Sequence, residues 1–275
     1  MSAEPVRLLY ESGPRIQPRA ARGKFARLRL ACMFLLLGFF YAAPWIQIGG
    51  QPLIWFDLPH RQFHIFGQLF APQDLILLSG LLILSAMSLF LFTTIAGRVW
   101  CGYACPQTVW TELFLWIEHC IEGDRHERLR LDKSPWDARK VLRRGGKHAA
   151  WLAAGLFTGL SFVAYFIPAR VLFPEALSLQ LAGWPLFWSL FYGFATWGNA
   201  GFMREQVCKY MCPYARFQSV MFDRDTLIIS YDEKRGEPRK GPLARAAGKT
   251  GDCVNCTLCV QVCPTGIDIR KGLQY

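Results

Sequence analysis

Four uncharged apolar runs divide this chain and constrain its fold more than any other feature. They cover residues 30–48, 75–96, 149–167 and 184–203, and none contains Asp, Glu, Lys or Arg. A helix of about 20 such residues crosses the roughly 30 Å hydrocarbon layer of a bilayer. Hydrophobic residues also make up 52% of the chain, which is rich for a soluble protein. The sequence therefore predicts an all-α polytopic membrane protein with four transmembrane helices.

The distribution of Lys and Arg predicts how these helices are oriented. Of the 31 basic residues, seven precede the first run, ten lie between the second and third, and twelve follow the fourth. The two remaining connections hold one each, Arg61 and Arg170. Because cytoplasmic loops are enriched in Lys and Arg, we expect both ends of this chain in the cytoplasm and membrane lipid around the helices. The net charge of +11 is a topology signal, so nucleic acid is not an expected partner.

The second and fourth runs are each followed by the same cysteine motif. Both motifs have the spacing C-x3-C-P with a Tyr in the same internal position, and their ligand candidates are Cys101, Cys105, Cys208 and Cys212. The repetition predicts two parallel hairpin repeats. If the halves meet, four thiolates could hold an extra iron–sulfur cluster or soft Cu(I). The alternative is helix packing with free thiols. We expect Arg98, Arg204 and Lys209 to lower the thiol pKa values.

A third cysteine motif lies near the end of the sequence. Cys253, Cys256, Cys259, Cys263 and Pro264 follow the C-x2-C-x2-C-x3-C-P pattern, which holds 4Fe-4S clusters in bacterial ferredoxins. In that arrangement the fourth cysteine ligates the other cluster. Zinc is the alternative, although zinc sites favour two separated cysteine pairs. The run predicts a partial bacterial-type ferredoxin domain of the α+β class.

These signals divide the chain into four parts. Residues 1–29 form a basic cytoplasmic arm, 30–222 the four-helix membrane domain, 223–251 a hydrated linker and 252–275 the start of the ferredoxin domain. The connection over residues 49–74 reads as an outer loop. It contains His60 and His64, whose spacing would suit a metal only if that piece were helical.

Together these motifs resemble the cytochrome c oxidase accessory protein family, which includes CcoG, FixG and RdxA. The likeness rests on residues 100–106, 208–213 and the ferredoxin run, and extends to 223–229 and 266–275. It covers essentially the whole chain and corresponds to the amino-terminal part of the family. Family members continue with a second ferredoxin cysteine run, a further span and a periplasmic domain.

The resemblance implies a multi-pass protein of the bacterial inner membrane that carries two 4Fe-4S clusters and handles copper. It further implies help in assembling cbb-type oxidases by reducing Cu(II) to Cu(I), an oxidoreductase-like role as a cupric reductase. Expected partners are oxidase subunits or their copper-delivery factors and a cytosolic electron donor. Because the second cysteine run lies beyond residue 275, we expect neither cluster to be complete within these residues.

Two other functions fit the same motifs. A quinol-oxidising iron–sulfur subunit of a respiratory complex would use the same clusters with electrons supplied from the membrane. A non-redox copper carrier would use the cysteines for transport alone, but the predicted spans contain no charged residue that would mark an ion path.

Overall fold

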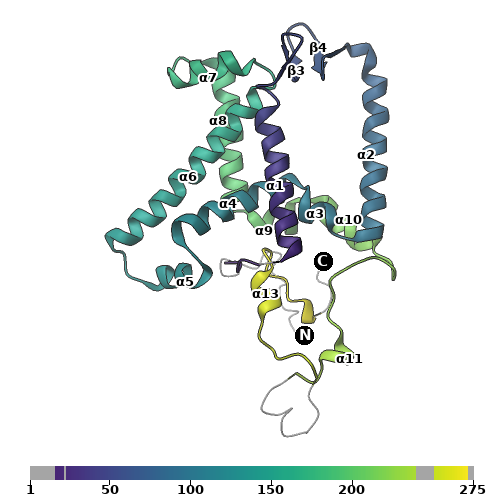
Figure 1. The fold of residues 1–275 in the computed structure, drawn as a ribbon, viewed down its shortest axis with the longest axis vertical. Coiled ribbons are helices and arrows are strands. Elements are labelled where there is room, and N and C mark those ends of the chain that lie inside the picture. The colour runs from purple at the N-terminus through teal and green to yellow at the C-terminus, as the bar shows by residue number, and fades with distance from the viewer. Residues whose placement is uncertain (1–15, 22, 240–250, 272–275) are drawn as a thin grey trace, which may run out of the picture.

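The computed structural model describes residues 16–21, 23–239 and 251–271 (Figure 1). Most of the predicted basic arm, residues 1–15, lies outside this description, as do residues 240–250 of the predicted linker and residues 272–275 of the ferredoxin segment. The described chain is mainly helical, as its apolar runs predict.

Four long helices carry the apolar runs. They are α1 (Lys24–Ala42), α2 (Leu75–Ala96), α6 (Ala138–Val163) and α8 (Gly183–Gly201). Shorter helices connect and extend them: α3 (Val99–Tyr103), α4 (Pro106–Glu122), α5 (Arg125–Lys133), α7 (Ala169–Leu177), α9 (Arg204–Gln206), α10 (Pro213–Met221), α11 (Glu233–Gly236) and α13 (Leu258–Val262). Single turns are η1 (Pro72–Asp74), η2 (Val207–Met211) and η3 (Ile269–Lys271).

Two of these helices are long and apolar enough to cross a membrane within the described residues. They are α1 and the segment Pro72–Ala96, which contains α2. The second half of α6 is apolar, but its first half carries five basic residues between Arg139 and Lys147. Helix α8 is rich in Trp and Gly, which lowers its mean hydropathy. The structure therefore supports a membrane-associated helical domain, and the count of four spans stays a prediction.

The prediction that the membrane domain is entirely α-helical is wrong for residues 47–70. This connection forms two small antiparallel sheets, β1 (Gln47–Ile48) with β2 (Gln51–Pro52), and β3 (Ile54–Asp57), β4 (Gln62–Ile65) and β5 (Gln68–Phe70) in that order. Apolar and aromatic residues in β3 pair with those in β4, for example Phe56 with Phe63. Such residues favour pleated strands, and the left-handed Arg61 and Phe66 make the turns between them.

Helices α6 and α8 form the closest helix pair because small residues line their contact. A Cβ added to Gly155 would lie 2.7 Å from the carbonyl oxygen of Gly193, and one added to Gly159 would lie 2.7 Å from the Gly193 nitrogen. Glycines that let backbones approach this closely are typical of helix pairs in membranes.

The buried core lies where α4 crosses α1, α6 and α8. Phe114 of α4, Trp151 of α6 and Ala200 of α8 pack together, and Met33 and Leu37 of α1 pack against Val109 of α4. Helix α2 stands apart from this bundle (Figure 1), and much of its apolar surface is exposed, including Leu81, Leu84 and Met87 at 60–66%. Hydrophobic surface of this extent fits a lipid surrounding.

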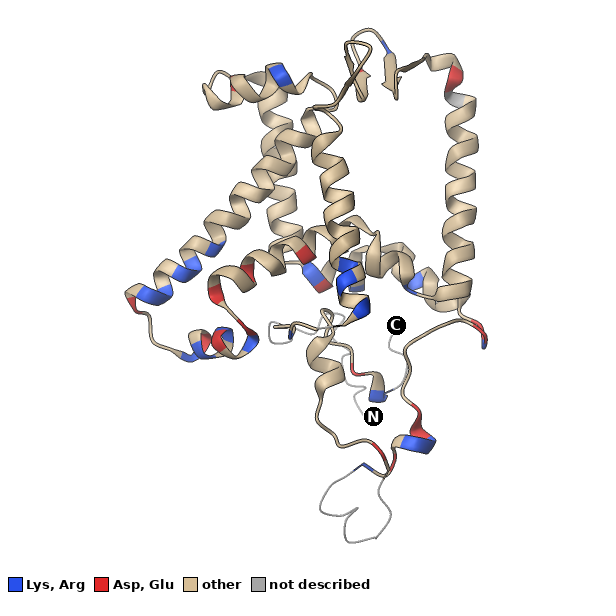
Figure 2. Cartoon of the chain, viewed as in Figure 1, with Lys and Arg blue, Asp and Glu red and all other residues tan. Residues whose placement is uncertain are grey.

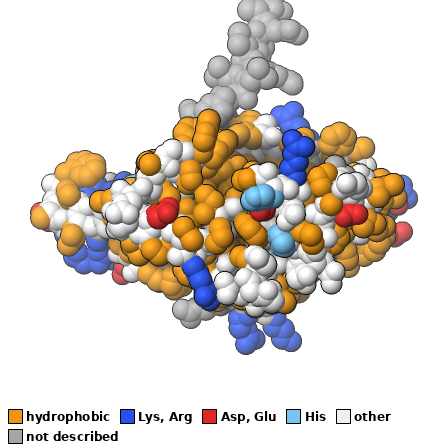
Figure 3. Space-filling model, turned by 90° about the horizontal axis from the view of Figure 1, so that it is seen from above, with side chains coloured by type: hydrophobic (Ala, Val, Ile, Leu, Met, Phe, Trp, Pro, Cys, Tyr) orange, Lys and Arg blue, Asp and Glu red, His pale blue; other side chains and the backbone are white. Residues whose placement is uncertain are grey.

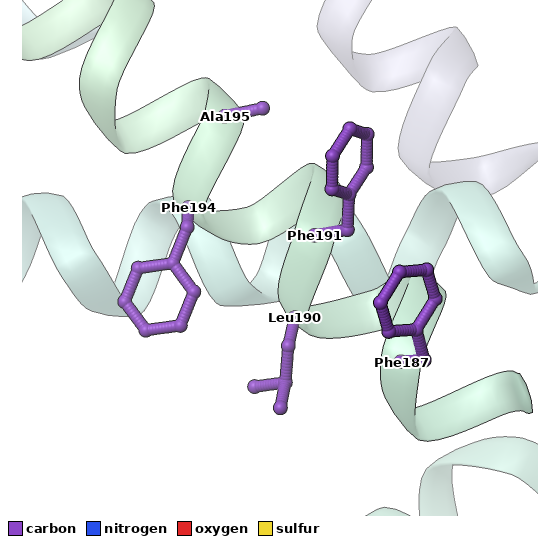
Figure 4. A pocket seen from close by; sticks show the side chains of 5 residues that line it. All are labelled: Phe187, Leu190, Phe191, Phe194 and Ala195. Atoms are coloured by element: carbon purple, nitrogen blue, oxygen red, sulfur yellow. The ribbon is translucent and has the colours of Figure 1, made fainter. Parts of the chain in front are cut away.

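Charged side chains gather at one end of the long helices (Figure 2). The upper parts of α1, α2, α6 and α8 form a band without Lys, Arg, Asp or Glu. The opposite end carries the sheets and α7, and Figure 3 shows it covered largely by hydrophobic and uncharged side chains. Helix α8 adds an open groove lined by Phe187, Leu190, Phe191, Phe194 and Ala195, all of them apolar (Figure 4).

Candidate metal centre

The first cysteine pair lies in the bend that follows α2. This helix ends at Gly97, whose φ of 56° is the left-handed conformation that favours glycine. Cys101 then lies in α3, and Cys105 is the N-cap residue of α4 with Pro106 in the first helical position. The hydroxyl of Thr108 donates to the carbonyl oxygen of Cys101 at 2.5 Å, which ties the two helices together.

The second pair repeats this arrangement after α8. Cys208 lies in the π-helical turn η2, and Cys212 is the N-cap residue of α10 with Pro213 first in the helix. The two prolines begin the next helices, because a proline in the first turn lacks only an N–H that would have no partner there. The repeats differ in that the first cysteine sits in an α-helix in one and a π-turn in the other.

Each half of the repeat packs its post-cysteine helix against the other half. Tyr214 of α10 is hydrogen bonded through its hydroxyl to Thr93 of α2. In the other direction, Gln107 of α4 donates to the carbonyl oxygen of Asn199 in α8 at 3.1 Å. Leu227 and Thr226, which follow α10, also bond to the backbone of α2. This exchange brings the two cysteine motifs into one region.

The four thiols of the two motifs lie close enough to interact electrostatically. Burial is the main cause that raises the pKa of Cys101 to about 11, and negative charge on Cys105, Cys208 and Cys212 raises it further. The pKa of Cys208 is also raised, first by burial and then by Cys105 and Cys212.

We expected basic neighbours to lower these thiol pKa values, but the pKa values of Cys101 and Cys208 are raised. Arg98 does lower the pKa of Cys208, but burial outweighs it. The guanidinium of Arg204 pairs with Glu118 at 2.9 Å.

A buried amide contacts the first cysteine. Gln218 of α10 donates its Nε2–H to Sγ of Cys101 at 3.4 Å, and its side chain is only 1% exposed. Cysteine spacing gives no sign of this residue. In the sequence Gln218 is marked only as a polar residue on a short helix that also carries Tyr214 and Phe217.

Among the described residues, no three Cys, His, Asp or Glu side chains are already spaced to bind a metal ion. The donor set nevertheless fits an iron–sulfur group: four thiols from two halves, partly buried, with an N–H aimed at one sulfur. Thiolates are the common ligands of iron–sulfur clusters and of Cu(I). Cys101, Cys105, Cys208 and Cys212 would hold such a group.

The ferredoxin run has the loop conformation that its spacing requires. Cys253, Cys256 and Cys259 lie before and within α13, and Asn255 and Thr257 on either side of Cys256 have left-handed φ angles of 53° and 57°. Alternating backbone conformations of this kind turn N–H groups toward a concavity that suits anionic clusters. Cys263 lies just after α13, 3.1 Å from the hydroxyl of Thr265. The described part of this segment contains α13 and η3 and no strand.

The ferredoxin run contacts the start of the described chain and α5. The amide of Arg19 donates to the carbonyl oxygen of Gln261 at 2.8 Å. Arg125 of α5 donates to the Gln17 carbonyl at 2.9 Å, and Arg128 donates to the Pro18 carbonyl at the same distance. The run therefore lies at the charged end of the helices, as Figure 1 shows for α13.

A buried ion cluster supports this end of the molecule. Glu118 of α4 pairs with Arg128, Lys147 and Arg204, and Glu122 pairs with Lys147 at 2.7 Å. Lys147 and Arg204 also lie 5.0 Å from the ring centre of Trp151. Glu118 therefore joins α4, α5, α6 and the residue that opens α9.

The histidine pair lies at the other end of the molecule. His60 follows β3 and pairs with Asp57 at 2.7 Å, while His64 in β4 stacks on Trp55 with ring centres 5.0 Å apart. These residues are not on a helix, so the spacing argument for a shared metal does not apply.

Family models match both cysteine regions. A 4Fe-4S binding domain matches residues 78–120 and includes the first pair, and a 4Fe-4S dicluster domain matches residues 203–275 and includes the second pair with the ferredoxin run. With the apolar helices, these matches define the chain as a membrane-associated iron–sulfur electron-transfer protein. No solved structure matches it.

Whole-chain comparison identifies the relatives. The sequence is 43% identical over 97% of the chain to nitrogen fixation protein FixG of Rhizobium meliloti, and 41% identical over 97% to proteins RdxA and RdxB of Cereibacter sphaeroides. These relatives confirm the resemblance to the CcoG/FixG/RdxA family. It spans about half the length of the curated relatives, 52% of FixG and 57% of RdxA and RdxB.

Proposed function

We propose that this protein passes single electrons from a cytosolic donor through its cysteine centres to Cu(II), and that the Cu(I) formed serves the assembly of a cbb-type oxidase. The observation that carries the electron-transfer part is the gathering of four thiols from two repeats beside the charged end of the helices. Family resemblance supports the copper and oxidase parts. The reaction is Cu(II) plus one electron to give Cu(I), with Cu(II) as the substrate.

The chain's own residues have distinct roles in this proposal. Cys253, Cys256, Cys259 and Cys263 bind iron at the charged end, where a cytosolic reductant has access. Cys101, Cys105, Cys208 and Cys212 bind the second centre in a half-buried site that excludes most water. An iron–sulfur cluster supplies reversible one-electron transfer at potentials set by its surroundings.

Copper is suited as the acceptor for a chemical reason. Thiolates are soft ligands that prefer Cu(I) to Cu(II), so a thiol-rich acceptor site on a copper-delivery partner would favour the reduced product. The preference lowers the free energy of the product state and makes the last electron step more favourable.

The proposed topology follows the charge distribution. The charged end would face the cytoplasm of a bacterial inner membrane, with four spans and both ends of this chain inside. Membrane lipid would cover the apolar faces of α2 and α8, including the groove of Figure 4. Oxidase subunits or copper-delivery factors would then be partners.

The test is a copper-reduction assay on the protein in membranes or detergent. Dithionite-reduced protein is mixed with Cu(II), and Cu(I) is followed with a coloured chelator. We expect the Cys101→Ser, Cys105→Ser, Cys208→Ser, Cys212→Ser variant to lose most of the rate, while Cys120→Ser, which removes an exposed lone thiol, keeps it. A wild-type rate in the quadruple variant would remove copper from the mechanism and favour quinol oxidation.

A further inference from the structure

The hydrogen bond between Gln218 and Cys101 connects the two halves of the repeat. Gln218 belongs to α10, which follows the second cysteine pair, whereas Cys101 belongs to the first pair. The donor is nearly completely buried at 1% exposure, so water does not compete for the sulfur from that side. A buried amide needs a partner for its N–H groups, and here the structure provides a cysteine sulfur.

The corresponding position in the first half is Thr111. Counted from Pro106 and Pro213, which begin α4 and α10, Thr111 and Gln218 are both the sixth residue of their helices. Thr111 is 9% exposed, and its Oγ1 is buried with no hydrogen-bond partner among the described residues. A buried hydroxyl without a partner is unusual, and a ligand bound next to it would satisfy it.

The contacts that each half makes with the other indicate where the Thr111 hydroxyl would find a partner. Helix α10 contacts α2 through Tyr214 and Thr93, and helix α4 contacts the end of α8 through Gln107 and Asn199. Tyr214 and Gln107 are themselves the second residues of their helices. Because Gln218 reaches the cysteine of the opposite half, the same relationship directs Thr111 toward the opposite pair, which contains Cys208.

A donor to a ligand sulfur changes the energy of electron uptake. Adding an electron increases the negative charge on the centre and its sulfurs, and an N–H or O–H dipole stabilises that charge. Removing the donor therefore disfavours the reduced state and lowers the reduction potential. The effect is strong in a buried site because the local dielectric constant is low.

We propose that Gln218 and Thr111 are positioning residues that set the reduction potential of the centre held by Cys101, Cys105, Cys208 and Cys212. Gln218 donates to the sulfur of Cys101, and the partnerless hydroxyl of Thr111, at the repeat-related position, would donate to the centre when it is bound. This inference rests on the proposed function, since it requires an electron-accepting centre at these cysteines. It adds the residues that decide how readily that centre accepts an electron.

The experiment is a redox titration of the purified full chain, with the reduced centre followed by its electron paramagnetic resonance signal. Iron content is measured on the same samples. We expect Gln218→Leu to keep the wild-type iron content. Its midpoint potential should fall by about 59 mV, which is a tenfold change in the one-electron reduction equilibrium. Thr111→Val should lower it as well, and the double variant should show the sum of the two shifts.

Ser219→Ala is the matched control. Ser219 neighbours Gln218 on α10, but its hydroxyl donates to the backbone carbonyl of Arg216 at 2.7 Å. Its removal should leave the potential unchanged. If Gln218→Leu does not fold, Gln218→Met keeps the length of the side chain and removes the donor, so it should lower the potential in the same direction.

The outcomes separate this inference from the function on which it rests. A wild-type chain with no reducible signal from these cysteines overturns both. A wild-type signal whose potential is the same in Gln218→Leu, with iron retained, overturns the role of Gln218 alone and leaves electron transfer intact. An unshifted potential in Thr111→Val overturns the repeat-related half of the proposal.

Discussion

Arg204 forms an ion pair with Glu118 at 2.9 Å between side chains that are 8% and 4% exposed. The pair joins α4 to the residue that begins α9, four positions before Cys208. Arg128 and Lys147 approach the same carboxylate at 3.5 Å. Two carboxylates, those of Glu118 and Glu122, thus face three buried cations.

Replacing Glu118 by Gln should destabilise the protein strongly. The change leaves three buried cations with one remaining carboxylate, and breaking a buried ion pair on one side costs about 3–5 kcal/mol. The measurement is denaturant or thermal unfolding in detergent. Glu127→Gln is the control, because Glu127 is 58% exposed and lies 4.0 Å from Arg143; it should change stability by at most about 1 kcal/mol. Equal stability of the two variants would contradict the role assigned to Glu118.

The sequence predicted the long helices well because each depends on a local property, a run of apolar residues. The predicted run 75–96 coincides with α2, and the later runs correspond to parts of α6 and α8. It failed for residues 47–70, where strand pairs such as Phe56 with Phe63 depend on contacts across a turn. The helix that carries the third predicted run begins earlier than the run, at Ala138, in a basic segment that is helical in spite of its charge.

The sequence identifies the cysteines of the site, but it does not identify the residues that surround them in the fold. Spacing identifies Cys101 and Cys105 as a pair, because ligand spacing is a property of the chain itself. The donation from Gln218 to Cys101 and the link between Glu118 and Arg204 join residues far apart in sequence. The prediction of lowered thiol pKa values was wrong for the same reason: burial raises these pKa values, and burial is set by the fold.

The contact between α6 and α8 predicts a second stability effect. In Gly159→Ala the new methyl group would overlap the backbone at Ser189 and lie 2.7 Å from the Gly193 nitrogen, so the helices must separate. Overpacking of this kind costs about 1–3 kcal/mol. Gly198→Ala on α8 meets open space and should be neutral or stabilising by up to about 1 kcal/mol. Thermal unfolding of both variants in one detergent would compare them, and a loss at Gly198 but none at Gly159 would refute the packing argument.

Reporter fusions should reveal the proposed topology. We expect cytoplasmic reporters to be active at Arg15, Arg139 and Lys249, and periplasmic reporters at Arg61 and Arg170, because basic residues concentrate on the cytoplasmic side. Arg15 and Lys249 lie outside the described residues, so these two positions test the sequence prediction alone. Periplasmic activity at Arg139 would rule out four spans with both ends of this chain inside.

The two cysteine pairs should behave as one site when they are mutated. The pKa values of Cys101 and Cys208 both respond to thiols of the opposite pair, which indicates that the four sulfurs share one region. Cys101→Ser with Cys105→Ser should therefore remove the iron bound at this site, and adding Cys208→Ser should cause little further loss, because one missing half already breaks a shared centre. Iron and sulfide per chain are the measurements, with Cys120→Ser as the control for loss of an unrelated thiol. Losses that add independently would mean two separate sites. The helix content of each variant, measured by circular dichroism, distinguishes a missing centre from a misfolded protein.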